Sequence, residues 1–176
     1  MQKSDKETSL KMLSTALKME ERGKRMYEKW EEKTNNAFSK EVFGMLAKDE
    51  LVHMRRIRAI YVSLDNGRGW DKNWKSLKFE HGDLKKVFAT LVKKHGGKLK
   101  VRASEIKAVE VGVELEQSSI KYYSEKLAKA TEKAEKAFLE KMVEEEKGHL
   151  SALLDLKMFL EDPADWHMKK ERHLPS

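Results

Sequence analysis

The chain has no cysteine among its 176 residues, and only two prolines and nine glycines. Without cysteine there can be no disulfide scaffold, no thiolate-bound zinc or iron–sulfur site, and no cysteine nucleophile. So few prolines and glycines exclude a β-protein built on many tight turns. Charge is what the chain has in abundance, because 38% of its residues are charged and lysine and glutamate, two good helix formers, are common. This composition predicts one all-α domain.

Long apolar runs are also missing. No uncharged stretch approaches the roughly 20 apolar residues needed to cross a bilayer, and residues 1–10 lack the apolar centre of a signal peptide. The net charge of +7 comes from interleaved acidic and basic residues, and the basic clusters are short. These clusters are Arg55–Arg58, Lys93–Lys100 and Lys169–Arg172. We therefore expect a cytoplasmic protein that has neither a membrane nor a nucleic acid as its partner.

Four long segments follow helical periodicity: residues 5–34, 37–64, 104–130 and 131–161. The polar residues 34–36 are suited to ending the first helix and capping the second, and Asn66–Gly69 should end the second. Ser104 and Thr131 are the expected starts of the third and fourth helices, and Pro163 follows the fourth.

The lengths of the connections predict how these helices are arranged. Short loops after the first and third helices indicate two antiparallel hairpins, which a crossover of about residues 65–103 joins. Within the crossover, Asp83 is expected to cap a short helix that starts at Leu84 and ends before Gly96. We predict a four-helix bundle over residues 1–162, followed by a C-terminal tail over residues 163–176.

The two hairpins share a repeat of 96 residues. The repeated pairs are Glu20 and Glu116, Tyr27 and Tyr123, Glu50 and Glu146, and His53 and His149. Each half therefore contains a glutamate, a tyrosine seven residues later, and a Glu-x-x-His pair that begins thirty residues after the first glutamate. Apolar positions repeat in the same register, which indicates an internal duplication of a helical hairpin.

The polar members of the repeat fall within the apolar stripes of their helices. Four carboxylates and two imidazoles should then point into one bundle interior, where unpaired ionised carboxylates would cost several kcal/mol each. Two divalent cations would balance four glutamates and leave both histidines neutral. One glutamate from each of two helices plus Glu-x-x-His from the other two is the donor set of ferritin-like di-metal sites. The predicted ligands are Glu20, Glu50, His53, Glu116, Glu146 and His149, and oxygen with imidazole ligation suits iron or manganese.

Other interpretations apply to the neighbouring residues. A Glu-x-x-His pair can arise by chance, and Tyr27 and Tyr123 are either ordinary core aromatics or donors to a ligand carboxylate. The glutamates next to the motif fall outside the repeated ligand positions and are expected to be solvated; they are Glu21, Glu114, Glu144 and Glu145. The remaining histidines lack a paired acid at helical spacing and are expected at the surface; they are His81, His95, His167 and His173. Three tryptophans are expected to be packing residues: Trp70, Trp74 and Trp166.

These motifs resemble those of a known family. Residues 16–23 with Tyr27, then residues 48–53, and in the second half residues 114–119 with Tyr123 and residues 145–149, resemble the rubrerythrin branch of the ferritin-like superfamily. The resemblance implies a ferritin-like fold and two iron ions held by the six ligands, with manganese or a mixed pair as the alternative. It also implies two-electron reduction of hydrogen peroxide or dioxygen at a carboxylate-bridged centre, and thus a peroxidase-type oxidoreductase.

The chain departs from the rubrerythrin pattern in two ways. Rubrerythrins carry an extra glutamate one turn beyond the ligand of the third long helix, where this chain has Ser119. They also carry a cysteine-bound iron domain that supplies electrons, and this chain has no cysteine. Electrons should therefore come from a separate donor protein.

Two further functional hypotheses remain. One is a ferroxidase that oxidises ferrous iron for storage or sequestration, as in ferritin, within a shell of 24 subunits. The other is a helical interaction module or DNA-coating protein that holds no metal. For the leading hypothesis we expect a homo-oligomer, a dimer.

Overall fold

The protein is an all-helical bundle. The computed structural model describes residues 3–82, 84–95 and 101–163, and over these residues it contains five α-helices, one short 3-10 helix and no strand. The elements are α1 (Lys3–Lys33), α2 (Ala37–Asp65), η1 (Asn73–Ser76), α3 (Leu84–His95), α4 (Ala103–Leu127) and α5 (Lys133–Glu161). None of these helices is long and apolar enough to span a membrane. The all-α class predicted from the composition is confirmed.

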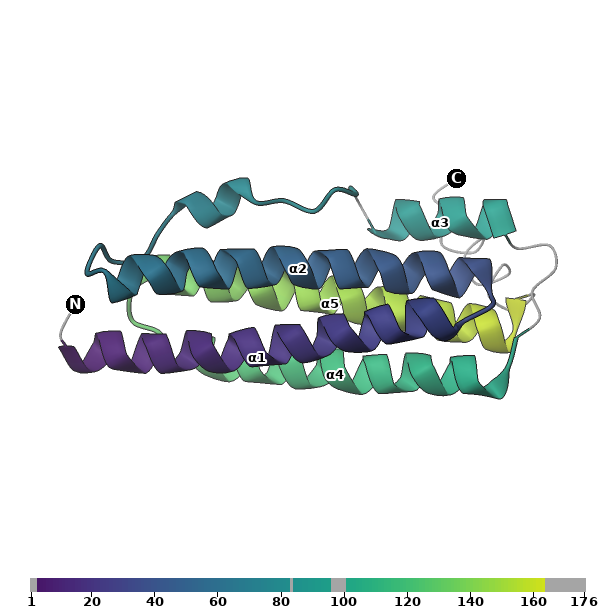
Figure 1. Ribbon diagram of the computed structural model, residues 1–176, viewed down its shortest axis with the longest axis horizontal. Helices are drawn as coiled ribbons and strands as arrows, with labels where there is room; N and C mark the ends of the chain where they lie inside the picture. Colours follow the sequence, from purple (N-terminus) through teal and green to yellow (C-terminus); the bar gives the residue numbers. More distant parts are fainter. Residues whose placement is uncertain (1–2, 83, 96–100, 164–176) are drawn as a thin grey trace.

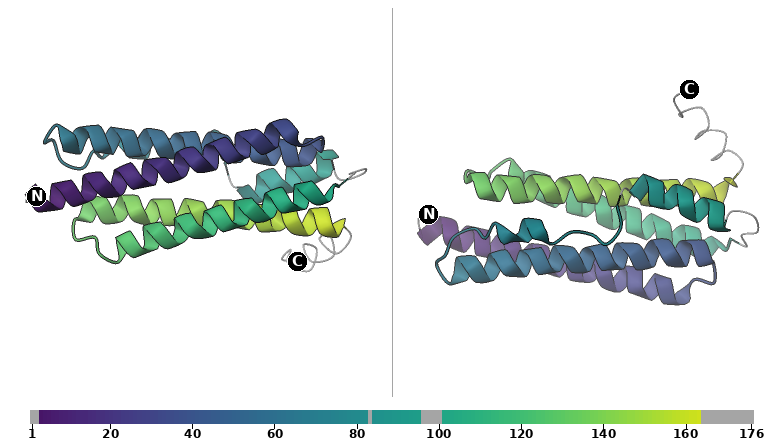
Figure 2. Two further views of the ribbon diagram at one scale, coloured as in Figure 1. Left: turned by 60° about the horizontal axis from the view of Figure 1, so that its bottom comes forward. Right: turned by 90° about the horizontal axis from the view of Figure 1, so that it is seen from above.

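Two antiparallel hairpins form the bundle. Helices α1 and α2 pack along their length, as do α4 and α5, and the crossover runs along the outside of the bundle from one end to the other (Figures 1 and 2). Within the crossover, α3 lies where the sequence predicted a short helix, whereas η1 was not predicted. The expected cap of α3, Asp83, and the tail from residue 164, with Trp166, His167 and His173, lie outside the described residues.

The helix ends follow local side-chain chemistry. At the start of α2, Asn36 Oδ1 accepts the backbone N–H groups of Phe38 and Ser39 at 3.0 and 3.3 Å, which confirms the predicted cap. Helix α2 is followed by Gly67 and Gly69, whose φ values of 73° and 79° lie in the left-handed region that glycine adopts without strain.

The predicted starts of the other two long helices are wrong by one or two residues. The N-cap of α4 is Arg102 rather than Ser104. Its backbone N–H donates to Glu105 Oε2 at 3.1 Å, while Glu105 Oε1 accepts from Thr34 at 2.5 Å, so a buried glutamate in the first turn of α4 satisfies the N-cap amide and ties the helix start to the end of α1. The N-cap of α5 is Glu132 rather than Thr131.

The cap at Asn36 allows a direct test of hairpin stability. Replacing Asn36 by alanine leaves two amide groups at the start of α2 without their acceptor, and should lower the free energy of unfolding by about 1 kcal/mol. Urea denaturation followed by circular dichroism measures the change. The Asn36→Asp variant keeps an acceptor oxygen and should unfold within a few tenths of a kcal/mol of the parent; equal losses in both variants would contradict the capping role.

The core consists of two apolar clusters. One gathers around Phe38, Phe43, Leu46, Leu153 and Phe159, and the other around Leu13, Ile57, Ile60, Leu139 and Met142. The apolar stripes that contain the repeated residues of α2 and α5 are buried as predicted. Their apolar members are all 0% exposed: Phe43, Leu46, Ile57 and Ile60 on α2, and Leu139, Met142, Leu153 and Leu156 on α5. Helical periodicity also places five apolar residues of α1 near one face, and of these Leu13 is fully buried while Leu10, Leu17, Met26 and Trp30 are only partly buried. Between the two clusters, the interior is polar.

Candidate metal centre

Six side chains from four helices meet in this polar layer. Helix α1 contributes Glu20, α2 contributes Glu50 and His53, α4 contributes Glu116, and α5 contributes Glu146 and His149. Each of the six is at most 3% exposed. The fold thus brings together all six residues that the repeat singled out.

Their donor atoms form two groups of four that share two carboxylates. One group is Glu20, Glu50, His53 and Glu146, and the other is Glu50, Glu116, Glu146 and His149. Within each group, one donor atom from every residue lies within 4.8 Å of the others. Glu50 and Glu146 belong to both groups, so they would be the ligands shared by a pair of ions.

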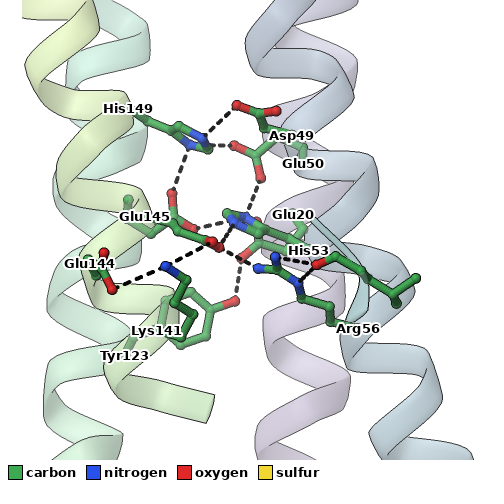
Figure 3. A network of polar contacts seen from close by, with 12 residues as sticks. Glu20, Asp49, Glu50, His53, Arg56, Tyr123, Lys141, Glu144, Glu145 and His149 are labelled. Carbon is green, nitrogen blue, oxygen red and sulfur yellow. Dashed lines mark hydrogen bonds and ion pairs between the residues drawn. The ribbon is translucent and has the colours of Figure 1, made fainter. Parts of the chain in front are cut away.

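Each histidine turns Nδ1 towards the carboxylates. Nδ1 of His53 lies 3.2 Å from Glu20 Oε2 and 3.3 Å from Glu50 Oε2, and Nδ1 of His149 lies 3.3 Å from Glu146 Oε2. The other ring nitrogen of each histidine faces a different carboxylate, outside the two groups. Nε2 of His53 is 3.1 Å from Glu145 Oε2, and Nε2 of His149 is 3.2 Å from Asp49 Oδ2 (Figure 3).

These outer carboxylates fix the orientation and tautomer of both rings. A proton on Nε2 satisfies the carboxylate and leaves the Nδ1 lone pair facing the centre, which is the form that binds a metal. The prediction that Glu145 is solvated was wrong, because its side chain is only 9% exposed. The sequence did carry a signal for it, since Asp49 and Glu145 are also 96 residues apart.

The two repeated tyrosines bond the remaining carboxylates. The Tyr27 hydroxyl on α1 donates to Glu116 on α4, and the Tyr123 hydroxyl on α4 donates to Glu20 on α1. The sequence left open whether these tyrosines are ordinary core aromatics or donors to a ligand carboxylate. In the structure each one donates to a candidate ligand. Each bond joins one hairpin to the other.

The crossover covers the histidine side of the centre. The Phe79 ring lies over both imidazoles, with centroid distances of 5.5 Å to His53 and 5.7 Å to His149. His81 Nε2 lies 2.6 Å from Asp49 Oδ2, so the prediction of a surface histidine is wrong; its side chain is 14% exposed. Sequence reasoning missed these residues because the crossover around them has no helical period.

The other neighbouring residues do not contribute donors to the centre. His95 is also not a free surface group, because its Nε2 lies 2.8 Å from Glu41 on α2 and ties α3 to the bundle. Glu114 and Glu144 are exposed as predicted, and Glu21 is half-buried with ion pairs to arginine side chains. Trp70 and Trp74 pack against Phe138 in the core, in agreement with the prediction.

The centre crowds four buried carboxylates around two buried imidazoles. Burial, together with the charge of Glu20, raises the pKa of Glu50 to about 8, and burial with the three surrounding carboxylates raises the pKa of Glu146 well above its ordinary value. Among the described residues, neither carboxylate oxygen of Glu146 has a hydrogen-bond partner, and neither has His149 Nδ1. Glu146 Oε2 and His149 Nδ1 lie 3.3 Å apart, and a divalent cation that displaced the protons held there would satisfy both atoms. The donor set fits two divalent ions.

A pocket borders one side of the centre. A pocket of about 190 Å³ between α1 and α4 is lined by Glu20, Glu50 and Glu116, with Gly23 and Ser119 among its other residues. On the opposite side, a pocket of about 250 Å³ reaches Phe79 and Glu145 but none of the six candidate ligands. Of these two pockets, the one that borders candidate ligands therefore lies between α1 and α4.

The comparisons with known proteins agree with this geometry. Residues 11–157 match the family model described as Rubrerythrin. Comparisons with curated proteins and with solved structures found no match. The matched region contains all four long helices over the centre and all six converging donors. The chain therefore belongs to the rubrerythrin family, a family of ferritin-like di-iron carboxylate proteins.

Proposed function

We propose that this protein reduces hydrogen peroxide or dioxygen at a pair of iron ions, with electrons from a separate donor protein. The observation that carries the proposal is the convergence of four glutamates and two histidines, with two shared carboxylates, beside a pocket that reaches three of them. Glu20, Glu50, His53, Glu116, Glu146 and His149 would hold the ions. When bound, the two ions supply one electron each, and two electrons with two protons convert one peroxide into two water molecules.

The chain's own residues prepare this chemistry. Asp49 holds the imidazole of His149, and Glu145 that of His53, so that Nδ1 of each ring faces the centre. The hydroxyls of Tyr27 and Tyr123 hold protons beside the carboxylates of Glu116 and Glu20. Such contacts keep donor atoms in place while charge changes at the centre, so less reorganisation is needed during reaction.

Rapid mixing tests the proposal. The purified chain is loaded anaerobically with two equivalents of Fe²⁺ and mixed with hydrogen peroxide or with dioxygenated buffer, and absorbance follows iron oxidation. We expect one peroxide to be consumed for two Fe²⁺ oxidised, faster than the reaction with dioxygen. Equal, slow oxidation by both oxidants would contradict peroxidase activity. Light scattering separates the ferritin alternative, because a storage function needs a shell of 24 subunits whereas we expect a dimer.

The pocket between α1 and α4 gives a second test. Replacing Ser119 by leucine should slow oxidation of the Fe²⁺-loaded protein roughly tenfold, because the larger side chain fills space through which an oxidant reaches the carboxylates. The matched control is Ser151→Leu in the pocket on the opposite side, which should leave the rate within about twofold of the parent. Stopped-flow absorbance measures both. Slowing by Ser151→Leu alone would place access on the crossover side instead.

A further inference from the structure

The repeat makes the inner parts of the two halves equivalent, but the charges behind the two histidines differ. Behind His149 stands Asp49, whose Oδ2 also meets His81 at 2.6 Å. Behind His53 stands Glu145, whose Oε2 also accepts from the Arg56 guanidinium. Lys141 approaches the same carboxylate, with its Nζ 3.5 Å from Glu145 Oε1 (Figure 3).

Arg56 is a permanent, buried charge. Its side chain is 3% exposed, and Nε and Nη2 both donate to the carbonyl oxygen of Leu77 in the crossover, at 2.8 and 2.5 Å. The guanidinium also lies against the rings of Trp74 and Phe79, at 5.9 and 5.5 Å from their centroids. An arginine so enclosed stays protonated and is poorly screened by solvent.

The residues that correspond to Arg56 and Lys141 in the other half of the repeat carry no charge. In the 96-residue register the counterpart of Arg56 is Ala152, and the counterpart of Lys141 is Met45. Both departures from the repeat therefore add a positive charge on the His53 side. Glu145 faces two cations in addition to His53, whereas among the described residues Asp49 has only His81 in addition to His149. Whichever protonation state His81 has, the surroundings of His53 are the more positive; the Glu144 carboxylate that shares Lys141 is 71% exposed and screened by solvent.

We propose that the two metal positions are inequivalent, and that the one served by His53 and Glu20 binds a divalent ion more weakly and fills second. This inference rests on the metal centre of the proposed function. The cause is twofold: extra positive charge repels a divalent cation, and a carboxylate shared with arginine is a weaker acceptor for the histidine N–H, so His53 becomes a poorer ligand. Arg56 is thus a tuning residue that acts through Glu145 without touching the ion.

A titration with Co²⁺ tests the inference without any turnover. Calorimetry and visible absorption should show two equivalents bound per chain, with dissociation constants that differ by about tenfold or more, the usual size of effects from groups behind a metal ligand. In the Arg56→Gln variant the weaker site should tighten until the two constants agree within about threefold. The matched control, His81→Gln, removes the titratable group behind Asp49 and should keep the ratio or widen it.

Two further variants keep the test decisive if Arg56→Gln proves poorly folded by circular dichroism. With Arg56 intact, His53→Ala should retain one ion with the tighter constant, and His149→Ala should retain one with the weaker constant. The reverse order, or wild-type constants within about threefold of each other, would overturn the inference while leaving a two-metal centre intact. A wild-type chain that binds no second equivalent would instead refute the centre itself.

Discussion

Replacing Glu146 by glutamine should abolish binding of the metal pair and yet leave the metal-free protein at least as stable as the parent. Glu146 belongs to both groups of donors, so its loss weakens both positions at once. Groups behind a ligand change metal affinity by about 10- to 100-fold, and a shared ligand should exceed that range. In the metal-free chain, however, this fully buried carboxylate has no hydrogen-bond partner among the described residues. A neutral amide there removes a repulsive charge and should add about 1–3 kcal/mol at pH 8.

Metal analysis after gel filtration and urea denaturation in chelator measure the two effects separately. The matched control is Glu144→Gln, two residues earlier on the same helix with a side chain that is 71% exposed. It should bind two ions and unfold as the parent does, because a solvated carboxylate contributes little to either property. If Glu146→Gln kept both ions, or if its metal-free form unfolded more readily than the parent, the bridging position of Glu146 would be wrong.

The metal-free protein should lose stability as pH rises from about 5 to 9, the reverse of ordinary acid denaturation. The pKa of Glu50 rises from 4.5 to about 8 because of burial first and the charge of Glu20 second. A group with a raised pKa stabilises the fold fully below its unfolded value and loses that contribution as pH passes through the folded value. For Glu50 the full loss is on the order of 5 kcal/mol, at about 1.4 kcal/mol per pKa unit.

The other ionisable groups of the centre act in the same direction or not at all over this range. The pKa values of His53 and His149 are raised because contacts with carboxylates outweigh the effect of burial, so their contribution is also lost as pH rises above 6.5. Burial alone would raise the pKa of Glu145, but hydrogen bonds from His53 and Arg56 outweigh burial and lower this pKa to about 2. Its contribution is complete above pH 4.5 and stays constant from there.

Urea denaturation in the presence of chelator at pH 5.5, 7 and 8.5 measures this slope. The Glu50→Gln variant should make the decline of stability with pH shallower, whereas Glu41→Gln, which removes a carboxylate bonded to Lys94 at a distance from the centre, should not. The metal-loaded protein should show no such decline, because the ions bind the deprotonated carboxylates and their affinity rises with pH. Metal-free stability that stays flat or increases over this range would show that the carboxylates are not crowded as described.

The helices and the six donors could be predicted from the sequence because both depend on periodicity. A 3- and 4-residue spacing places Glu50 and His53 on the same face as Leu46 and Ile57, and the 96-residue repeat identifies their partners. Glu145 was missed because it is next to a ligand on the helix and turned about 100° away from the apolar stripe. In a four-helix bundle without a crossover that position would face water. Here Glu145 contacts His53 and Arg56, and Arg56 in turn is bonded to the crossover at Leu77.

The crossover itself could not be predicted in this way. Its contacts to the centre run through a backbone carbonyl at Leu77, one ring at Phe79 and one imidazole at His81, none of which repeats or alternates. The burial of Arg56 could not be predicted from the sequence either. This residue belongs to the basic cluster Arg55–Arg58, in which Arg55 and Arg58 are exposed while Arg56 is buried and bonded inward. Which arginine of a cluster turns inward depends on what lies over the helix.

The exchange of hydrogen bonds between hairpins has a consequence for how this protein can be divided. A fragment cut at the crossover would retain three of the donors. In the N-terminal fragment, however, Tyr27 and Asp49 would lack their partners Glu116 and His149. In the C-terminal fragment, Tyr123 and Glu145 would lack Glu20 and His53. Neither fragment would therefore contain a half of the centre in which every donor keeps its hydrogen-bond partner. Only two hairpins packed face to face complete it, so a single hairpin would have to pair with a second copy before it could present all six donors with their hydrogen-bond partners.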